Sequence, residues 1–409
     1  MTLYLRLAWR NIWRHRRRTI IIVIAMGLAL ALMMFYDGLV DGFNQAIYGN
    51  AIRVLGGNIQ IHTAGYREKA DSNPLLPLTN DSAVVKAALS QPNVISATRR
   101  IQTGGLASNR EGAFSVSIIG IEPEAEAPVS LIAANIAGGR WLTADDQDSI
   151  LIGKGLADVM GLKVGDRLTV VGSDIHKQNR RRTMTVTGIY DIGLPTVEKS
   201  TVYISLNEAQ TLYGLPGQST EVDINLKTLG KESSFVAALA PALPGYEVES
   251  WDKNYPELAS ALTQKGAAMN IFSVIIELIA GIGILNLLLM AVYERTREIG
   301  LLGAMGLKPR QIATLFILEG TMVGLVGAAA GVLLGLLING SFGIVGMDFT
   351  QFASVTEYTA LISGRVYTSF GLGNIFARAI TVLIIATLAA WIPASEAARR
   401  EPAEALHYV

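Results

Sequence analysis

The 409-residue sequence contains no cysteine, which excludes disulfides, thiolate metal sites and cysteine nucleophiles. It has only four histidines (His15, His62, His176 and His407), and their scatter gives no metal-ligand spacing. A G-x-x-x-x-G-K-[ST] phosphate loop does not occur either, so the sequence has no Walker motif for binding ATP. We expect no metal site and no catalytic centre of these kinds.

The sequence also has no surplus of either charge, because 34 Lys and Arg residues balance 34 Asp and Glu residues. Half of all residues are hydrophobic, which is too apolar for an ordinary soluble protein. The apolar residues gather in runs long enough to cross a bilayer. We therefore predict four transmembrane helices, at residues 19–40, 269–293, 312–339 and 374–393.

Basic residues predict the orientation of these helices. Residues 1–18 hold six arginines, and basic residues also occur in the 294–311 segment and in the tail 394–409. The positive-inside rule places these three segments in the cytoplasm. Four spans then leave both termini inside, with residues 41–268 and the loop 340–373 outside.

The first 18 residues are predicted to form an amphipathic helix at the membrane surface. One side carries four arginines and the other carries apolar and aromatic residues; the two sets are Arg6, Arg10, Arg14 and Arg17, and Leu5, Trp9, Ile12 and Trp13. A merely basic end that sets topology is the alternative, and both can hold. A cleaved signal peptide is less consistent with so long a basic region and no small-residue cleavage site.

The exterior segment has an α+β pattern. Asn80 or Asp81 can cap a helix through Leu89, and Asn207 can cap another that ends at Gly214. The sequence Lys177–Arg182 predicts a solvated cationic hairpin tip; contact with an acidic partner is the alternative. Further elements are predicted as strands at 94–107, 113–121, 167–171, 183–190, 200–205 and 221–227, and a helix at 232–240.

The segment between the second and third spans mixes charged with apolar residues. Its apolar set, Ile299, Leu301, Leu302 and Met305, can form one exposed patch over a helical turn or two. Gly306 is a suitable helix end, and Pro309 prevents the helix from continuing. An ordinary solvated loop is the alternative interpretation.

The string ERTREIGLLGAMG at 294–306 resembles the coupling segment of the FtsX/MacB-type ABC transporter permeases, a family that includes the lipoprotein-releasing permeases. The tail Pro393–Leu406 is similar to the C-terminal end of that family. The resemblance implies that a separate ATPase docks on this segment. The implied contact residues are Glu294, Arg295, Arg297, Glu298, Ile299, Gly300, Leu301, Leu302, Ala304, Met305 and Gly306.

The same resemblance implies a fold class: a membrane α-helical protein with four transmembrane helices and a large α+β extracytoplasmic domain. That domain would consist of a porter-like lobe, about 50–121 and 206–252, and an inserted β-rich lobe, about 122–205. Residues 253–268 would form a stalk that returns to the membrane. In the family the first two spans line the dimer interface, which implies substrate or dimer contacts at Met34, Phe35, Ile271 and Ile275.

Polar residues inside the predicted spans are Glu277, Asn286, Glu319 and Arg378. Glu277 and Arg378 would lie about 24 and about 21 Å above the inner face at 1.5 Å rise per residue. Unpaired charges are costly at this depth, so we expect the two to pair or to face one polar cavity. Snorkelling of Arg378 to the headgroups is the alternative. Glu319, at about 10 Å by the same rise, is expected to contact the coupling region. The glycines of the third span predict close helix packing within one subunit, or less readily a dimer seam.

The sequence therefore indicates a permease subunit in a bacterial inner membrane, with no enzymatic activity or cofactor of its own. ATP and Mg²⁺ would bind the partner ATPase dimer. Other expected partners are a second permease copy or paralogue, membrane lipid, and a periplasmic lipoprotein, carrier or adaptor; no nucleic-acid partner is expected. Lipoprotein release by mechanotransmission is the first functional hypothesis. Efflux of a drug, peptide or other amphiphile and non-transporting regulation of cell-wall hydrolases are the alternatives, and a membrane-anchored enzyme is disfavoured.

Overall fold

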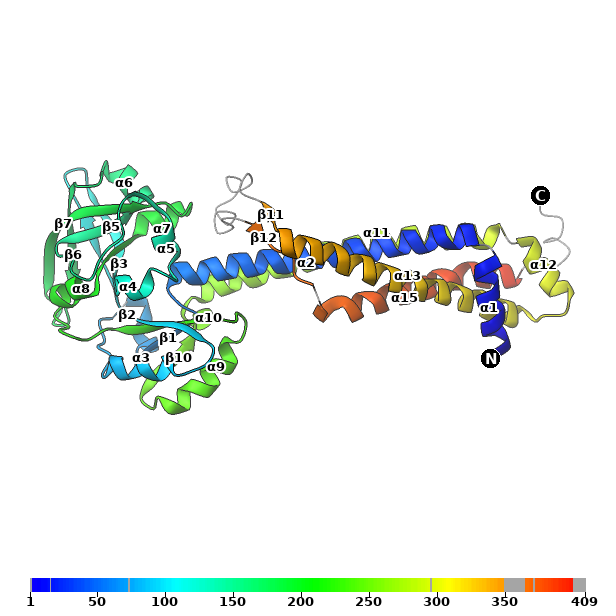
Figure 1. Ribbon diagram of the computed structural model, residues 1–409, viewed down its shortest axis with the longest axis horizontal. Helices are drawn as coiled ribbons and strands as arrows, with labels where there is room; N and C mark the ends of the chain where they lie inside the picture. Colours follow the sequence, from blue (N-terminus) through cyan, green and yellow to red (C-terminus); the bar gives the residue numbers. More distant parts are fainter. Residues whose placement is uncertain are drawn as a thin grey trace. The chain divides into compact units, whose positions relative to one another are not determined.

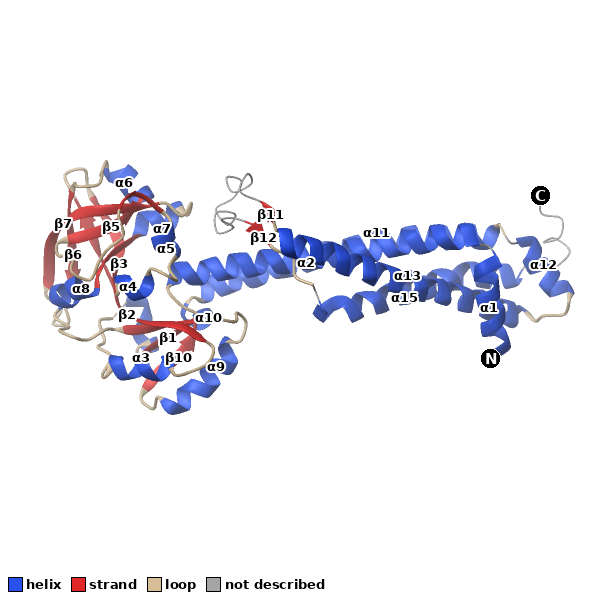
Figure 2. Cartoon of the chain, in the orientation of Figure 1, coloured by secondary structure: helices blue, strands red, loops and turns tan. Residues whose placement is uncertain are grey.

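The computed structural model describes residues 2–14, 16–72, 74–294, 296–348, 365–370 and 372–399, and it divides into two compact units (Figure 1). The helical unit contains Met1–Asn44, Thr263–Asp348 and the described residues from Arg365 onward. The sheet unit contains Gln45–Leu262. Figure 2 shows that almost all strands belong to the sheet unit.

The helical unit is built on four long apolar helices that each satisfy the length and hydropathy of a membrane span. Two of them, α2 (Arg16–Leu55) and α11 (Pro256–Tyr293), continue into the sheet unit. The other two are α13 (Pro309–Val345) and α15 (Leu372–Arg399). Short elements complete the unit: α1 (Thr2–Arg14), α12 (Thr296–Ala304), and the paired strands β11 (Met347–Asp348) and β12 (Arg365–Val366).

Glycines let α13 approach its neighbours closely. A Cβ on Gly324 would lie 2.9 Å from Ala386 of α15, and one on Gly331 would lie 2.8 Å from Leu30 of α2. The predicted packing within one subunit is therefore present, since this glycine face is covered by the chain's own helices.

The sheet unit contains ten strands that are hydrogen-bonded in one network. They are β1 (Ile59–Thr63), β2 (Val94–Ser108), β3 (Ala113–Ile121), β4 (Ile136–Gly139), β5 (Ser149–Gly153), β6 (Arg167–Ser173), β7 (Asn179–Tyr190), β8 (Thr201–Ser205), β9 (Glu221–Leu226) and β10 (Tyr246–Ser250). Pairing follows the order β2–β3–β8–β5–β7 and returns through β6, which pairs with both β7 and β2. These strands therefore close into a β-barrel.

The long strand β2 belongs to two structures at once. Val94–Arg100 pairs with β9 in an open sheet of order β10–β1–β9–β2, whereas Gly105–Ser108 pairs with β6 in the barrel. Each part covers a separate hydrophobic core: Ile59, Val84 and Val222 belong to the first, and Ile118, Leu168 and Tyr213 to the second.

The cores divide the sheet unit differently from the predicted lobe boundaries. The second half of β2, β3 and α8 (Leu206–Tyr213) pack into the barrel core, although 50–121 and 206–252 were assigned to the porter-like lobe. The reason is the barrel closure, which depends on pairing between segments that are distant in sequence. The open sheet is covered by α3 (Asp81–Leu89) and α9 (Glu232–Leu239), as the α/β pattern predicted.

The remaining short elements connect the strands. They are η1 (Arg67–Ser72), α4 (Pro123–Glu126), α5 (Leu131–Ala134), α6 (Lys154–Met160), α7 (Pro195–Ser200), η2 (Ala240–Ala242) and α10 (Trp251–Asn254). Asn80 stands at the N-terminus of α3 with φ 54°, but its side chain makes no capping bond. The predicted Asn207 cap was wrong: Ser205 Oγ accepts a hydrogen bond from the Glu208 N–H instead, so α8 starts earlier.

The predicted cationic tip at Lys177–Arg182 was also wrong in part. The turn is Asp174–Gln178, and the arginines lie in strand β7 opposite β6. Arg180 pairs with Asp174 at 2.9 Å, and Arg182 pairs with Asp148 at 2.5 Å. Neighbouring carboxylates therefore neutralise much of the charge within the barrel itself.

Candidate functional site

The helical unit contains a charged cluster between three of its long helices. Arg378 of α15 donates from Nε and Nη2 to the two carboxylate oxygens of Asp37 on α2, at 2.8 and 3.0 Å. Its Nη1 lies 3.1 Å from Glu277 of α11, and Nη2 also bonds to the Ser273 hydroxyl. Both charged hydrogen bonds to Asp37 form a bidentate pair, which is the strong geometry for an arginine.

This cluster contains the predicted pair of Glu277 and Arg378. The sequence argument missed Asp37, which is the bidentate partner and has a side chain only 9% exposed. The predicted first span, 19–40, includes Asp37, but Asp37 was not among the polar residues considered inside the spans. In the structure α2 continues as one helix to Leu55, which places Asp37 on its packed face. The cluster fixes three helices at one level.

The helix α12 occupies the predicted coupling segment. Ile299 is buried against Ile312, Phe316 and Ala394, and Leu302 packs partly on the same group. Leu301 and Met305 instead face outward, with 54% and 63% of their surface exposed. The predicted single apolar patch is therefore split: one side anchors α12 to its own unit, and the other is free.

The outward side of α12 carries Arg297 and Leu301, and Met305, which directly follows the helix, continues this row at four-residue spacing; all three are exposed. We call this set the α12 stripe. Ala304 and Gly306 are exposed beside it, Gly300 is buried, and Glu298 is partly buried. Gly306 has φ 94°, and the Leu307 N–H donates to the Leu302 carbonyl, so the predicted glycine stop is confirmed.

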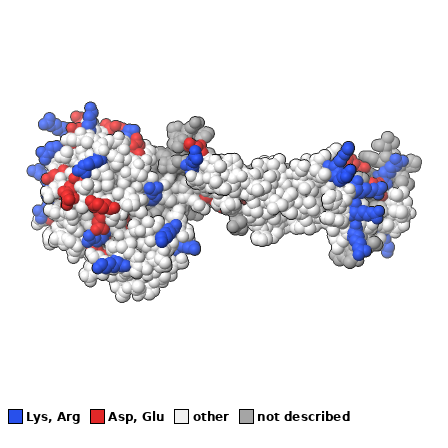
Figure 3. Space-filling model, viewed as in Figure 1, with Lys and Arg blue, Asp and Glu red and all other residues white. Residues whose placement is uncertain are grey.

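Two predicted contact residues precede α12. Glu294 forms an ion pair with Arg18 at 3.2 Å and keeps half of its side chain exposed. Arg295 lies outside the described residues. Figure 3 shows basic side chains gathered near α1 and α12, while the adjoining stretch of long helices shows almost no charge on this face. Such a distribution is typical of a membrane span with a polar end.

The first helix, α1, packs on α13, and its residues Ala8 and Ile12 are both buried. Trp9 and Trp13 remain exposed and meet edge to face, with ring centroids 5.9 Å apart. Asn11 lies 3.5 Å from Glu319 of α13, so this carboxylate meets α1. The exposed aromatic side agrees with the predicted interfacial helix.

The residues predicted for a substrate or dimer interface do not form one surface. Met34 is 3% exposed and packs against Gly335, so it belongs to the interior of its own helical bundle. The ring centroids of Phe35 and Phe342 are 5.4 Å apart. Ile271 and Ile275 are 62% and 45% exposed on α11 and remain available for a partner or lipid. Asn286 is also exposed.

Comparison with known protein families agrees with this architecture. Residues 19–242 match the model of the MacB-like periplasmic core domain, and residues 270–402 match that of the FtsX-like permease C-terminal domain. Together these matches define a multi-pass membrane protein with an extracytoplasmic domain. The chain belongs to the FtsX/MacB-type family of ABC transporter permeases.

Several relatives resemble the whole chain. The lipoprotein-releasing system transmembrane protein LolC of Neisseria meningitidis is 23% identical over 95% of this chain and 94% of its own length. The macrolide export ATP-binding/permease protein MacB of Agrobacterium fabrum is 25% identical over 99% of this chain and 60% of its own length. The extracellular domain of the transporter YknZ from Gram-positive bacteria is 17% identical, covers 47% of this chain and 99% of its own, and superimposes with a TM-score of 0.34.

The chain is thus a permease, and membership in this class implies a partner ATPase. The predicted fold class is confirmed: four long apolar helices accompany a MacB-like α+β domain that contains a β-barrel.

Proposed function

We propose that this permease releases lipoproteins from the bacterial inner membrane, driven by a separate ATPase dimer that docks on the α12 stripe. The exposed Leu301 and Met305 carry the proposal. Large apolar side chains at the charged end of a membrane bundle, beside an exposed arginine, suit a protein partner better than water. In this proposal the partner supplies the ATP site, as expected for a permease of this family.

A route for movement supports this proposal. The buried side of α12 packs on Phe316 of α13 and Ala394 of α15. Helix α15 also carries Arg378, which binds Asp37 of α2 and Glu277 of α11. Because α2 and α11 both continue into the sheet unit as unbroken helices, a push on α12 would reach the extracytoplasmic domain through packed helices and ion pairs.

The lipoprotein substrate is favoured by relatives such as LolC, whose similarity extends over almost the whole of both chains. The same proposal includes a permease dimer, formed with a second copy or a related subunit, and cytoplasmic termini. Efflux of an amphiphile is the second candidate, since MacB is similar to 99% of this chain. MacB of Agrobacterium fabrum is named as a combined ATP-binding/permease protein, and the match to this chain spans 60% of its length.

Pull-down of the solubilised chain tests the docking surface. Leu301→Asp with Met305→Asp should abolish retention of the ATPase, because an apolar interface cannot accommodate two unpaired carboxylates. Leu89→Asp is the matched control: Leu89 is 51% exposed at the end of α3, in the sheet unit, and this variant should keep the ATPase.

The outcomes decide both parts of the proposal. A folded double variant that retains the ATPase would exclude the α12 stripe as the docking surface. Lipoproteins identified by mass spectrometry in the native complex would favour release, and their absence together with a bound small amphiphile would favour efflux.

A further inference from the structure

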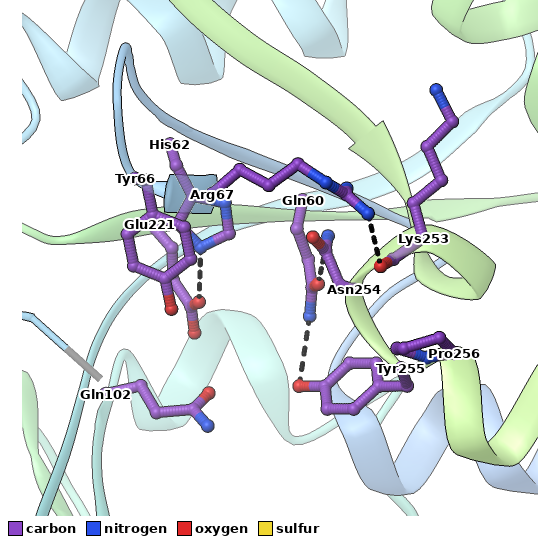
Figure 4. A pocket seen from close by; sticks show the side chains of 10 residues that line it. All are labelled: Gln60, His62, Tyr66, Arg67, Gln102, Glu221, Lys253, Asn254, Tyr255 and Pro256. Atoms are coloured by element: carbon purple, nitrogen blue, oxygen red, sulfur yellow. Dashed lines mark hydrogen bonds and ion pairs between the residues drawn. The ribbon is translucent and has the colours of Figure 1, made fainter. Parts of the chain in front are cut away.

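A polar pocket of about 200 Å³ lies in the sheet unit, between β1, β9 and the residues that lead into α11 (Figure 4). Its lining includes Gln60 and His62 from β1, Tyr66 from the following loop, and Gln102 from β2. Glu221 comes from β9, and Tyr255 directly precedes α11. None of these residues belongs to the α12 stripe or the charged cluster.

The walls of the pocket are held in place by specific contacts. His62 Nε2 lies 3.0 Å from Glu221 Oε2, and both side chains are only 3% exposed. The Tyr66 ring stacks on the His62 ring, with centroids 3.7 Å apart and planes 7° from parallel. The Gln60 amide donates to the Tyr255 hydroxyl at 3.4 Å. The site is therefore largely organised before anything binds.

This organised site contains a hydrogen-bond acceptor that receives no hydrogen bond from the described residues. Glu221 Oε1 is buried and has no hydrogen-bond partner among the described residues. Figure 4 shows the Glu221 carboxylate, the Gln102 amide and the Tyr255 hydroxyl around one space, with no dashed line to Gln102. A buried carboxylate oxygen without a donor is costly, so this space favours a ligand that brings N–H groups.

Charged side chains lie behind and around the pocket. Asp223 and Glu126 are buried outside the pocket lining and share one guanidinium, that of Arg100. Burial, followed by the repulsion of Glu221, raises the pKa of Asp223 well above its usual range. Asp223 therefore favours its neutral form, and Arg100 and Glu126 form an ion pair, so Glu221 is the acidic residue that the pocket itself presents. Two basic residues, Arg67 and Lys253, also line the pocket. The Arg67 guanidinium pairs with Glu249 at 2.6 Å, and the Lys253 side chain points away from Glu221 in Figure 4.

We propose that this pocket binds a small primary ammonium group, with Glu221 as the charged acceptor and Gln102 and Tyr255 as neutral acceptors. Three acceptors match the three N–H donors of an ammonium ion. A metal ion fits less well, because the described residues contain no group of three or more His, Asp or Glu side chains able to ligate one.

The position of the pocket gives ligand binding a consequence. Tyr255 and Pro256 line it, and Pro256 is the first residue of α11, which continues to Tyr293. A ligand that bonds to Tyr255 would hold the start of this helix against β1 and β9. The pocket is thus a candidate sensor of amines on the extracytoplasmic side.

Calorimetric titration of the full chain in detergent tests the proposal, with ethanolamine as the probe. Tetramethylammonium is the matched ligand control, since it has the same charge and no N–H donor. We expect saturable binding of ethanolamine only. Glu221→Gln should weaken it at least about tenfold because a charge-assisted hydrogen bond is lost. Gln102→Met, which removes the amide but keeps the length of the side chain, should also weaken it.

Glu111→Gln provides the control for the protein. Glu111 is exposed in the β2–β3 turn, outside the pocket, so this variant should bind like the native chain. Glycerophosphoethanolamine serves as a second probe, and its tighter binding would identify the amine as a lipid headgroup; tighter binding of ethanolamine would indicate a free amine.

Three results would overturn the proposal: no binding of either amine up to about 10 mM, equal binding of tetramethylammonium, or unchanged affinity in folded Glu221→Gln and Gln102→Met. The titration measures the pocket alone, so its outcome is separate from that of the ATPase pull-down.

Discussion

Arg378 and Asp37 are 341 residues apart in sequence, and they form a bidentate ion pair between α15 and α2. Glu277 of α11 binds the same guanidinium. One arginine thus joins the first, second and fourth long helices. Because a low-dielectric environment makes an unpaired charge expensive, the three residues depend on one another.

Removal of Arg378 alone should therefore destabilise the helical unit strongly. We expect Arg378→Gln to cost about 3–5 kcal/mol, because Asp37 and Glu277 lose their counter-ion. Thermal unfolding in detergent measures the effect. The triple variant Arg378→Gln, Asp37→Asn, Glu277→Gln removes every charge and should recover most of the loss. A triple variant as unstable as the single one would show that hydrogen-bond geometry, not charge balance, is decisive.

The two acidic partners should differ when charges are exchanged. Each exchange leaves the remaining acidic partner facing a carboxylate at position 378. Asp37→Arg with Arg378→Asp can nevertheless rebuild the bidentate pair, whereas Glu277→Arg with Arg378→Glu restores only the single contact. We expect the first exchange to recover more thermal stability than the second. Equal recovery would contradict the assignment of Asp37 as the principal partner.

The glycine contacts of α13 predict position-specific sensitivity. A Cβ on Gly331 would lie 2.8 Å from the Leu30 side chain and 2.9 Å from the Gly27 carbonyl. Gly331→Ala should cost about 1–3 kcal/mol because the helices must separate. Gly283→Ala on α11 is the matched control, since a methyl group added there would meet no described atom within 4 Å. Equal melting temperatures for the two variants would contradict close packing of α13.

The buried carboxylate Asp223 predicts a pH dependence of stability. Its pKa is raised, first by burial, so the folded state binds a proton that the unfolded state releases above about pH 3.9. This contribution to stability is complete below that pH and declines as pH rises toward the folded-state pKa. Asp223→Asn has no such proton to lose. The melting temperature of this variant minus that of the native chain should therefore increase from pH 4 to 7, and a constant difference would refute the prediction.

Features set by local sequence could be predicted. The long apolar runs predicted the four spans, and the Gly306–Pro309 spacing predicted the end of α12, because hydropathy and backbone restriction act within one segment. Most strands of the sheet unit followed from alternation of apolar and polar residues. The proximity of Glu277 and Arg378 followed from their similar depth, which was estimated from helical rise.

Features set by distant pairing could not be predicted. Arg100 follows Arg99 in a strand and has the sequence character of a surface residue, yet it is 1% exposed between Glu126 and Asp223. Its burial depends on partners 26 residues and more than 100 residues away along the chain. The same holds for barrel closure through β6, and for Asp37, whose role appears only when α15 is placed against α2.

The double membership of β2 has a consequence for how the sheet unit unfolds. Although it has two hydrophobic cores, each depends on the same fifteen-residue strand, Val94–Ser108. Loss of one core would therefore release a strand that the other needs, and the two should melt in a single cooperative transition. Side chains alternate along this strand, so a one-residue insertion at its centre would reverse the faces beyond it and disturb the barrel at once. The extracytoplasmic domain is therefore expected to unfold as one cooperative unit, although it has two hydrophobic cores.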